Sequence, residues 1–332
     1  MLNRLKIEKL FSLYDYDIDL TNADGSMVKF ITAPNGYGKT TILDFIDGVM
    51  KQNFDKMFDI PFGKFMMFFK ESDIDAEYQV TIQRSDDESD SSDSDVDAIV
   101  AIRLTVSLSK NIGSEASLVE SFMVSRYTDG RDETIGDTSN LDMFFESRTC
   151  HYITDTRLLK RKTDADGKVE AMETISMGQY AADMQRILQS PVLTKEYASR
   201  IDVFKRIIDR CEFANKRLDI NEKFGIRFVA HDELETKLSL DQLSSGERHI
   251  IIQVYELLFK AQDGTLVMID EPELSLHMMW QMNYLKNLEE IINLRGFQCI
   301  VATHSPQIFN SLWSKTVDLF TLTQGSRNAT VS

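Results

Sequence analysis

The run from Met27 to Thr40 sets strong limits on how this chain folds. Residues 27–32 are apolar enough for a buried strand, and residues 40–50 carry apolar side chains at helical spacing. The octet Ala33-Pro-Asn-Gly-Tyr-Gly-Lys-Thr joins the two. A buried strand that turns directly into a half-buried helix is typical of layered α/β domains. The octet also has the spacing of a phosphate-binding loop, with Ala33 in place of the usual first glycine.

Each polar position of the octet has a chemical role in such a loop. Gly36 and Gly38 let backbone N–H groups close around phosphates, and the helix N-terminus adds positive potential. Lys39 supplies a charge for the β and γ phosphates, Thr40 offers a hydroxyl to magnesium, and Asn35 lies on the γ-phosphate side. Taken alone, the octet also fits an ordinary glycine turn before a helix. The rest of the sequence must decide between the two interpretations.

A second apolar segment ends in a group of acids. Residues 266–269 are Leu-Val-Met-Ile, and Asp270-Glu271-Pro-Glu273 follow at once. Open α/β sheets bind ligands at the carboxyl ends of their strands. We therefore predict that Asp270 belongs to the magnesium shell and that Glu271 positions and polarises the attacking water. The alternative is a strand end with solvated acids, which is common for one acid and less so for this cluster.

Two shorter motifs are weaker on their own. Leu243-Ser-Ser-Gly-Glu247 precedes an apolar helix predicted over 246–261, and Ser and Gly at a helix start are ordinary capping residues. His304 follows a buried strand predicted over 297–303, where a single histidine is more often structural than catalytic. Neither motif defines a site by itself.

The rest of the chain predicts supporting structure. Alternating segments predict strands at residues 5–10 and 15–20, and antiparallel strands at residues 77–84, 98–108 and 118–127. The acidic, serine-rich run 85–97 is predicted to be a solvated loop, and it lacks the glycine and distal Glu of an EF-hand calcium loop. Residues 178–222 are predicted to form helices broken near Pro191, and a further helix is expected near 277–293.

Composition limits the environment and the partners. The 37 Lys and Arg residues face 53 Asp and Glu residues, and the formal net charge is −16. This acidity argues against non-specific phosphate binding over the whole surface, although a local basic groove stays open. The three cysteines have no CxxC spacing, so no disulfide framework or zinc site is expected. Without a signal peptide or a long apolar stretch, we expect a cytoplasmic protein with no membrane partner.

The order of these motifs resembles the ABC-type ATPases, and specifically their soluble branch of SMC, RecN, RecF and OLD-like proteins. Within that branch the chain is similar to bacterial ATPases of anti-phage defence that are related to OLD nucleases. The resemblance rests on Lys6-Ile-Glu-Lys-Leu-Phe11, Pro34-Asn-Gly-Tyr-Gly-Lys-Thr-Thr41, Leu243-Ser-Ser-Gly-Glu-Arg248, Asp270-Glu-Pro-Glu-Leu-Ser-Leu-His277 and Thr303-His-Ser-Pro306.

The resemblance implies an α/β fold, that of an ABC-type P-loop ATPase with a mixed, mostly parallel core sheet. An antiparallel β subdomain and an inserted helical arm would complete it. The whole chain would be one ABC ATPase domain with an N-terminal lobe at 1–150, the arm at 151–240 and a C-terminal lobe at 241–332.

The resemblance also implies ATP and Mg²⁺ as cofactors and a head-to-tail homodimer. Ser244 and Gly246 would contact the γ-phosphate of ATP on the other subunit, His304 would sense the same phosphate in its own subunit, and Leu274–His277 would lie at the dimer interface. The catalytic residues expected are Glu271, His304 and Lys39, and the metal ligands are Thr40 and Asp270. The expected nucleotide contacts are Asn35, Gly36, Tyr37, Gly38, Lys39, Thr40, Thr41, Ser244, Ser245, Gly246 and Glu247.

One departure from the family pattern concerns a glutamine. The family carries it in a strand that joins the lobes, where it contacts magnesium and water. The corresponding segment, Tyr152–Leu158, contains no glutamine. Thr156 or Arg157 would take its place.

The main functional hypothesis is a nucleotide-dependent dimer switch that controls a nuclease or toxin in anti-phage defence. Because the sequence ends soon after His304, that effector is expected on a separate chain. A higher oligomer and a DNA partner remain open. The alternative is a RecF-like ATP-dependent DNA-binding clamp in repair, and a transporter ATPase is a third and weaker hypothesis.

Overall fold

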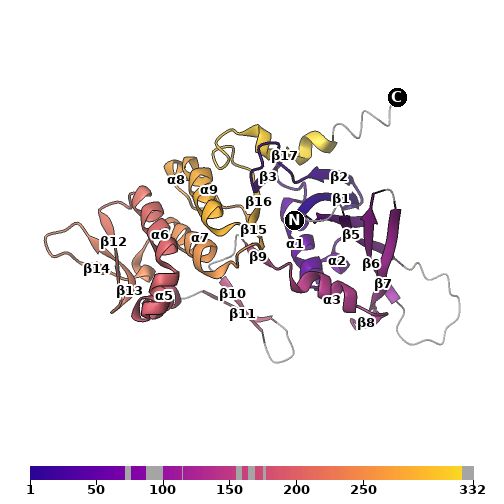
Figure 1. Cartoon of the computed structure of the whole chain (residues 1–332), viewed down its shortest axis with the longest axis horizontal. Coiled ribbons are helices and arrows are strands. Elements are labelled where there is room, and N and C mark those ends of the chain that lie inside the picture. The colour runs from indigo at the N-terminus through magenta and orange to yellow at the C-terminus, as the bar shows by residue number, and fades with distance from the viewer. Residues whose placement is uncertain are drawn as a thin grey trace. The chain divides into compact units, whose positions relative to one another are not determined.

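The computed structural model describes residues 1–71, 76–86, 100–113, 115–154, 159–163, 169–174 and 177–323. The chain divides into two compact units (Figure 1). The first unit comprises Met1–Cys150, Gln298–His304 and Trp313–Ser332, and the second comprises His151–Phe297 and Ser305–Leu312.

A seven-stranded antiparallel sheet dominates the first unit. Its strand order is β2-β1-β4-β5-β6-β7-β8. Apolar residues alternate along β1, so one face of the sheet is buried. The strands are β1 (Leu2–Leu10), β2 (Tyr14–Asp19), β4 (Lys64–Lys70), β5 (Ala76–Asp86), β6 (Val100–Ile112), β7 (Glu115–Tyr127) and β8 (Asp132–Ile135).

Helices cover this sheet through aromatic contacts. Phe45 of α1 (Lys39–Met50) meets Phe65 of β4 edge to face, with ring centroids 5.5 Å apart. Phe144 of α3 (Ser139–Glu146) meets Phe69 of the same strand at 5.3 Å. The short helix α2 (Asp55–Asp59) follows α1. These rings form the core between helices and sheet.

Parallel pairing is also present in the first unit. Strand β3 (Val28–Thr32) lies between β16 (Gln298–Thr303) and β17 (Thr316–Asp318), and it is parallel to both. Every residue of β3 and β16 is buried. A parallel strand buried on both faces is an apolar run rather than an alternating one, which explains the sequence of β3. The glycine turn leads from this strand into α1.

The second unit is mainly helical. Its helices are α4 (Gly178–Gln189), α5 (Pro191–Glu196), α6 (Ala198–Arg210), α7 (Ser245–Tyr255), α8 (Met278–Met282) and α9 (Tyr284–Arg295). Helix α7 continues as a π-helix over Glu256–Lys260. Within the second unit, a cluster of aromatic rings forms between α4, α6 and α7 with its π-helical continuation. Its members are Tyr180, Phe204, Tyr255 and Phe259.

Strands complete the second unit. The buried strand β15 (Leu266–Asp270) is hydrogen-bonded to β9 (Cys150–Ile153). The other strands form a hairpin, β10 (Leu159–Thr163) with β11 (Val169–Thr174), and a small sheet of β12 (Lys216–Asn221), β13 (Gly225–Ala230) and β14 (Lys237–Leu238).

These elements confirm the predicted α/β class with parallel and antiparallel sheets. The predicted strands at 5–10, 15–20, 77–84, 98–108 and 118–127 correspond to β1, β2, β5, β6 and β7, with residues 98–99 outside the described ranges, and the buried strands β3, β15 and β16 are also present. The division of one domain into segments 1–150, 151–240 and 241–332 stays a prediction. In the part of the chain that the structure describes, no helix has the length and apolar character needed to cross a membrane.

Several predicted boundaries were wrong. The helices expected over 178–222 end at Arg210, and residues 216–221 form β12 because they pair with β13 along their whole length. The helix expected near 277–293 is two helices separated at Asn283. In the predicted acidic loop, Ser85 and Asp86 belong to β5, whereas residues 87–97 lie outside the described residues.

Candidate functional site

The glycine turn of the first unit has the backbone expected of a phosphate loop. Gly36 and Gly38 have φ values of +88° and +85°, a left-handed conformation that residues with a Cβ rarely adopt. Gly38 is the N-cap of α1, and among the described residues no side chain caps that helix. The N-terminus of α1, with the positive end of its helix dipole, is a position at which proteins commonly bind anions.

Lys39 belongs to the same turn. Its side chain is buried, and Nζ donates a hydrogen bond to the carbonyl oxygen of Ala33 at 2.9 Å. The ammonium group therefore lies over the turn. Thr40 is exposed in the first turn of α1, and Asn35 and Gly36 are exposed beside it. The structure thus brings the predicted residues 35–41 together in one loop.

An aromatic stack supports Tyr37. Its ring stacks on that of Tyr14, with centroids 5.3 Å apart, and Tyr14 stacks in turn on Tyr16 at 5.8 Å. The hydroxyl of Tyr16 donates to the carbonyl oxygen of Tyr37 at 2.9 Å. Burial raises the pKa of Tyr16, so it remains a donor at neutral pH. The sequence analysis did not identify this support, although the i, i+2 spacing of Tyr14 and Tyr16 places both rings on one strand face.

The acids of the second unit lie at the end of β15, where Asp270 is the last residue of the strand and Glu271 and Glu273 come after it. Asp270 is 1% exposed and Glu273 is 5% exposed. Glu271 has a φ of +44°, an uncommon conformation for a residue other than glycine, and such strain is often found at functional sites. The carboxylate of Glu273 accepts a hydrogen bond from the backbone N–H of Ser305 at 3.2 Å.

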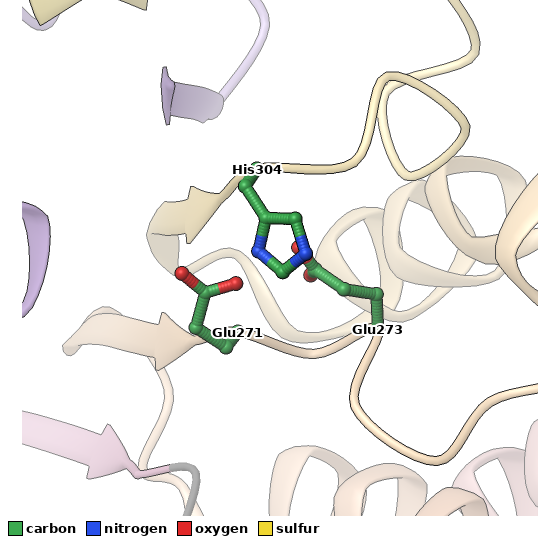
Figure 2. A group of neighbouring side chains, drawn as sticks. All are labelled: Glu271, Glu273 and His304. Atoms are coloured by element: carbon green, nitrogen blue, oxygen red, sulfur yellow. The ribbon is translucent and has the colours of Figure 1, made fainter. Parts of the chain in front are cut away.

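That bond brings the residue preceding Ser305 close to the acids. Glu271, Glu273 and His304 each offer one ligand-type atom, and these atoms lie within 4.8 Å of one another. Figure 2 shows both carboxylates directed toward the imidazole of His304. Two of the predicted catalytic residues are therefore neighbours. Glu273 is a third member that the sequence analysis did not assign, although it is part of the Asp-Glu-Pro-Glu motif.

The turn at Ser244 is a fully formed helix cap. The Ser244 side chain accepts from the backbone N–H of Glu247 at 3.3 Å, and the Glu247 carboxylate accepts from the backbone N–H of Ser244 at 2.8 Å. This reciprocal pair is a capping box. Lys216 of β12 also donates to the Glu247 carboxylate at 2.7 Å.

These contacts set the charge state of Glu247. Burial alone would raise the pKa of its carboxyl group. Hydrogen bonds from Lys216 and Ser244 outweigh burial, so the pKa lies below its ordinary value. Glu247 is thus a charged residue that holds the turn, and its direct contact with a nucleotide stays a prediction. No local sequence pattern indicated Lys216, which lies 31 positions earlier.

Gly246 is in close contact with the segment that follows the acids. A Cβ at Gly246 would lie 2.4 Å from the carbonyl oxygen of Ser275 and 3.3 Å from the ring of Trp280. Only glycine fits there without a shift of the backbone. The Ser-Ser-Gly-Glu turn and the segment Leu274–His277 are therefore in close contact within the second unit.

A parallel strand, a glycine-rich phosphate loop and an acidic strand end define the class of P-loop ATPases. The chain matches the family model described as AAA ATPase domain over residues 79–309. This match covers well over half of the 332 residues, and the chain belongs to that family. The predicted ATPase class is confirmed, with ATP as the nucleotide that such an enzyme binds.

Two curated proteins are similar over part of the chain. The Retron Ec83 probable ATPase of Escherichia coli is 34% identical over 97 residues, which are 26% of this chain and 18% of that protein. Protein ea59 of Escherichia phage lambda is 30% identical over 88 residues, 24% of this chain and 17% of that protein. The matched segments thus span less than one fifth of either relative.

Among solved structures, the chain is similar to an Smc head bound to the C-terminal winged-helix domain of ScpA. The TM-score is 0.49 at 14% identity, covering 92% of this chain and 90% of that one. For the SMC head domain from Thermotoga maritima the TM-score is 0.43 at 14% identity, with coverages of 93% and 91%.

The predicted site residues thus fall into three groups. Residues 35–41 form the glycine turn of the first unit, whereas Ser244–Glu247 form the capped turn of the second. Asp270 ends β15 and Glu271 follows it, and His304 lies close to Glu271. Thr156 and Arg157, the predicted substitutes for the family glutamine, lie outside the described residues.

Proposed function

We propose that this chain is an ABC-type ATPase whose active sites form between two subunits arranged head to tail. The observation that carries the proposal is the cluster of Glu271, Glu273 and His304 after a buried strand that ends in Asp270. It supplies a carboxylate that can polarise water and an imidazole that can contact a phosphate. The glycine turn of the first unit would bind the β and γ phosphates of the same nucleotide.

The proposed residues fit a magnesium–nucleotide complex. The hydroxyl of Thr40 and the carboxylate of Asp270 are hard oxygen donors, which Mg²⁺ prefers, and they would hold the ion. When bound, the ion neutralises charge on the β and γ phosphates. Lys39 would add a further positive charge at the same oxygens.

Hydrolysis then requires a positioned water molecule. Glu271 would orient this water and polarise its O–H bond while the oxygen attacks the γ phosphorus. The bond from that phosphorus to the β–γ bridging oxygen breaks, its electrons stay on ADP, and the protons of the water leave with the released phosphate. His304 would hold the γ-phosphate in line. Little covalent chemistry is needed from the protein, so positioning and charge supply the catalysis.

A second subunit would complete each site. Ser244, Ser245 and Gly246 would meet the γ-phosphate bound by the partner, so that ATP holds two subunits together and hydrolysis releases them. A contact made only while the γ-phosphate is present gives a two-state switch. Higher oligomers could be built from such dimers.

We further propose that this switch works in the cytoplasm and controls a separate nuclease or toxin in anti-phage defence. The likeness to a probable ATPase named for a retron supports such an association with another component. A DNA-binding clamp has less support, because the net charge of −16 disfavours broad contact with phosphates.

Replacing the proposed catalytic carboxylate tests the mechanism. We expect Glu271→Gln to bind ATP, to hydrolyse it about a hundredfold more slowly and to accumulate as an ATP-bound dimer. Steady-state ATPase assays and light scattering with and without ATP would measure this. The exposed Glu233→Gln is the matched control. Wild-type hydrolysis by Glu271→Gln would refute the role of Glu271.

A further inference from the structure

Ser305, the residue after His304, is held by three side chains of the second unit. It is buried, and its backbone N–H donates to the carboxylate of Glu273 at 3.2 Å. Its Oγ lies 2.8 Å from Oε1 of Gln281 and 2.7 Å from Oε1 of Gln307. A hydroxyl has one proton, so Ser305 donates to one of these two oxygens at a time. The nucleotide mechanism above leaves all of these contacts without a role.

Gln281 connects Ser305 to the segment after the acids. Its Nε2 donates to the carbonyl oxygen of Leu276 at 3.0 Å, which leaves its Oε1 facing Ser305. A single amide therefore links the carbonyl of Leu276 to the hydroxyl of Ser305. Gln281 lies on the five-residue helix α8, so the path of contacts from the Leu274–His277 segment to Ser305 is short.

The other end of this path is also fixed. Gly246 packs against the carbonyl of Ser275 and the ring of Trp280, as described above. The indole Nε1 of Trp280 donates to the carbonyl oxygen of Cys211 at 2.7 Å, which anchors α8 to the end of α6. The segment Leu274–His277 thus contacts the capped turn on one side, and on the other it is linked to Ser305 through the side chain of Gln281.

We infer that Glu273, Gln281 and Ser305 are positioning residues that couple the Leu274–His277 segment to His304. The inference rests on the proposed function, in which that segment lies at the subunit interface and His304 contacts the γ-phosphate. Glu273, one of the acids, accepts a hydrogen bond from the backbone N–H of Ser305. Gln281 binds the Ser305 hydroxyl and also the carbonyl oxygen of Leu276 in the Leu274–His277 segment. Contact between two subunits thereby sets the orientation of His304.

Two substitutions that nearly preserve the size of the side chain test the coupling. Gln281→Leu and Ser305→Ala each remove the bond between Gln281 and Ser305. We expect each to lower kcat for ATP about threefold to tenfold, the effect of one buried hydrogen bond, with KM changed less than about twofold. Because both remove the same bond, the double variant should be no slower than the slower single variant. Gln307→Leu, which removes the other acceptor of Ser305, is the matched control and should keep the wild-type kcat.

A second readout separates coupling from simple support of the fold. The double variant Glu271→Gln/Gln281→Leu should still form the ATP-dependent dimer. Gln281→Leu alone should hydrolyse ATP slowly, so assembly and hydrolysis are measured separately. Wild-type kcat in Gln281→Leu and Ser305→Ala, or losses that add in the double variant, would overturn the inference. Loss of the ATP-dependent dimer would also overturn it. If Glu271→Gln itself hydrolyses normally, the proposed function fails instead.

Discussion

Helices α1 and α7 begin in opposite ways. The N-terminus of α1 follows two left-handed glycines and has no side-chain cap among the described residues, and Lys39 lies over it. The N-terminus of α7 has a complete capping box, whose carboxylate is also bound by Lys216.

This difference indicates two tasks. A helix start without a side-chain cap and beside a lysine presents backbone N–H donors and positive charge, which suits direct binding of phosphates. A capped start has already satisfied part of its backbone, so it keeps a fixed shape instead. The first turn is suited to bind the nucleotide of its own subunit, and the second is suited to present Ser244 and Ser245 to another surface.

Among substitutions that distinguish the capped turn from the glycine turn, we expect Gly246→Ala to have the largest effect on stability and activity. In Gly246→Ala the new methyl group would overlap the carbonyl oxygen of Ser275, which belongs to the backbone and cannot simply rotate away. We expect a loss of about 1–3 kcal/mol in the free energy of unfolding and a severe loss of ATPase activity.

Chemical denaturation and ATPase assays would measure both changes. Ser245→Ala, in the same helical turn but exposed, should leave stability nearly unchanged. Equal stabilities for the two variants would show that the close contact between Gly246 and Ser275 is wrong.

A smaller effect is expected on the pH dependence of thermal stability, to which the capped turn contributes through Glu247. The pKa of Glu247 is depressed from 4.5 by Lys216 and Ser244, against the opposing effect of burial. Its ionised form therefore stabilises the fold above about pH 4.5, and this stabilisation is lost as the pH falls through the depressed pKa. Lys216→Met should lower the thermal midpoint at pH 7 and do so less at acidic pH.

Thermal unfolding at several pH values would show this convergence with wild type. The exposed Lys223→Met is the control and should follow the wild-type curve throughout. A constant offset between wild type and Lys216→Met at every pH would contradict the link between Lys216 and Glu247.

The sequence predicted the elements whose signals are local. Strands β3, β15 and β16 are apolar runs that end in polar motifs, and their positions were correct within two residues. The sequence did not predict that residues 216–221 form a strand, because their partner is β13. Strand β13 also packs closely on α4, because a Cβ at Gly225 would lie 1.7 Å from the carbonyl oxygen of Ala181.

In the candidate site, too, features with a local sequence signal were predicted and contacts between distant residues were not. The glycine turn, the capped turn and the acids of β15 could be located from the order of residues alone. The bonds from Glu273 to Ser305 and from Lys216 to Glu247 join positions 32 and 31 residues apart, and no periodicity connects them. Such support appears only after the chain has folded, since tertiary packing decides which polar groups meet.

The central claim is that one subunit supplies the glycine turn and another supplies the capped turn. Mixing two inactive variants, Lys39→Ala and Ser244→Arg, tests it most directly through the ATPase rate of the mixture. In a mixed dimer one site combines both defects, whereas the other combines an intact Lys39 with an intact Ser244. We predict that each variant alone is inactive and that the mixture regains part of the wild-type rate. If the mixture stays inactive while both variants are folded and dimerise, the two turns do not meet across subunits.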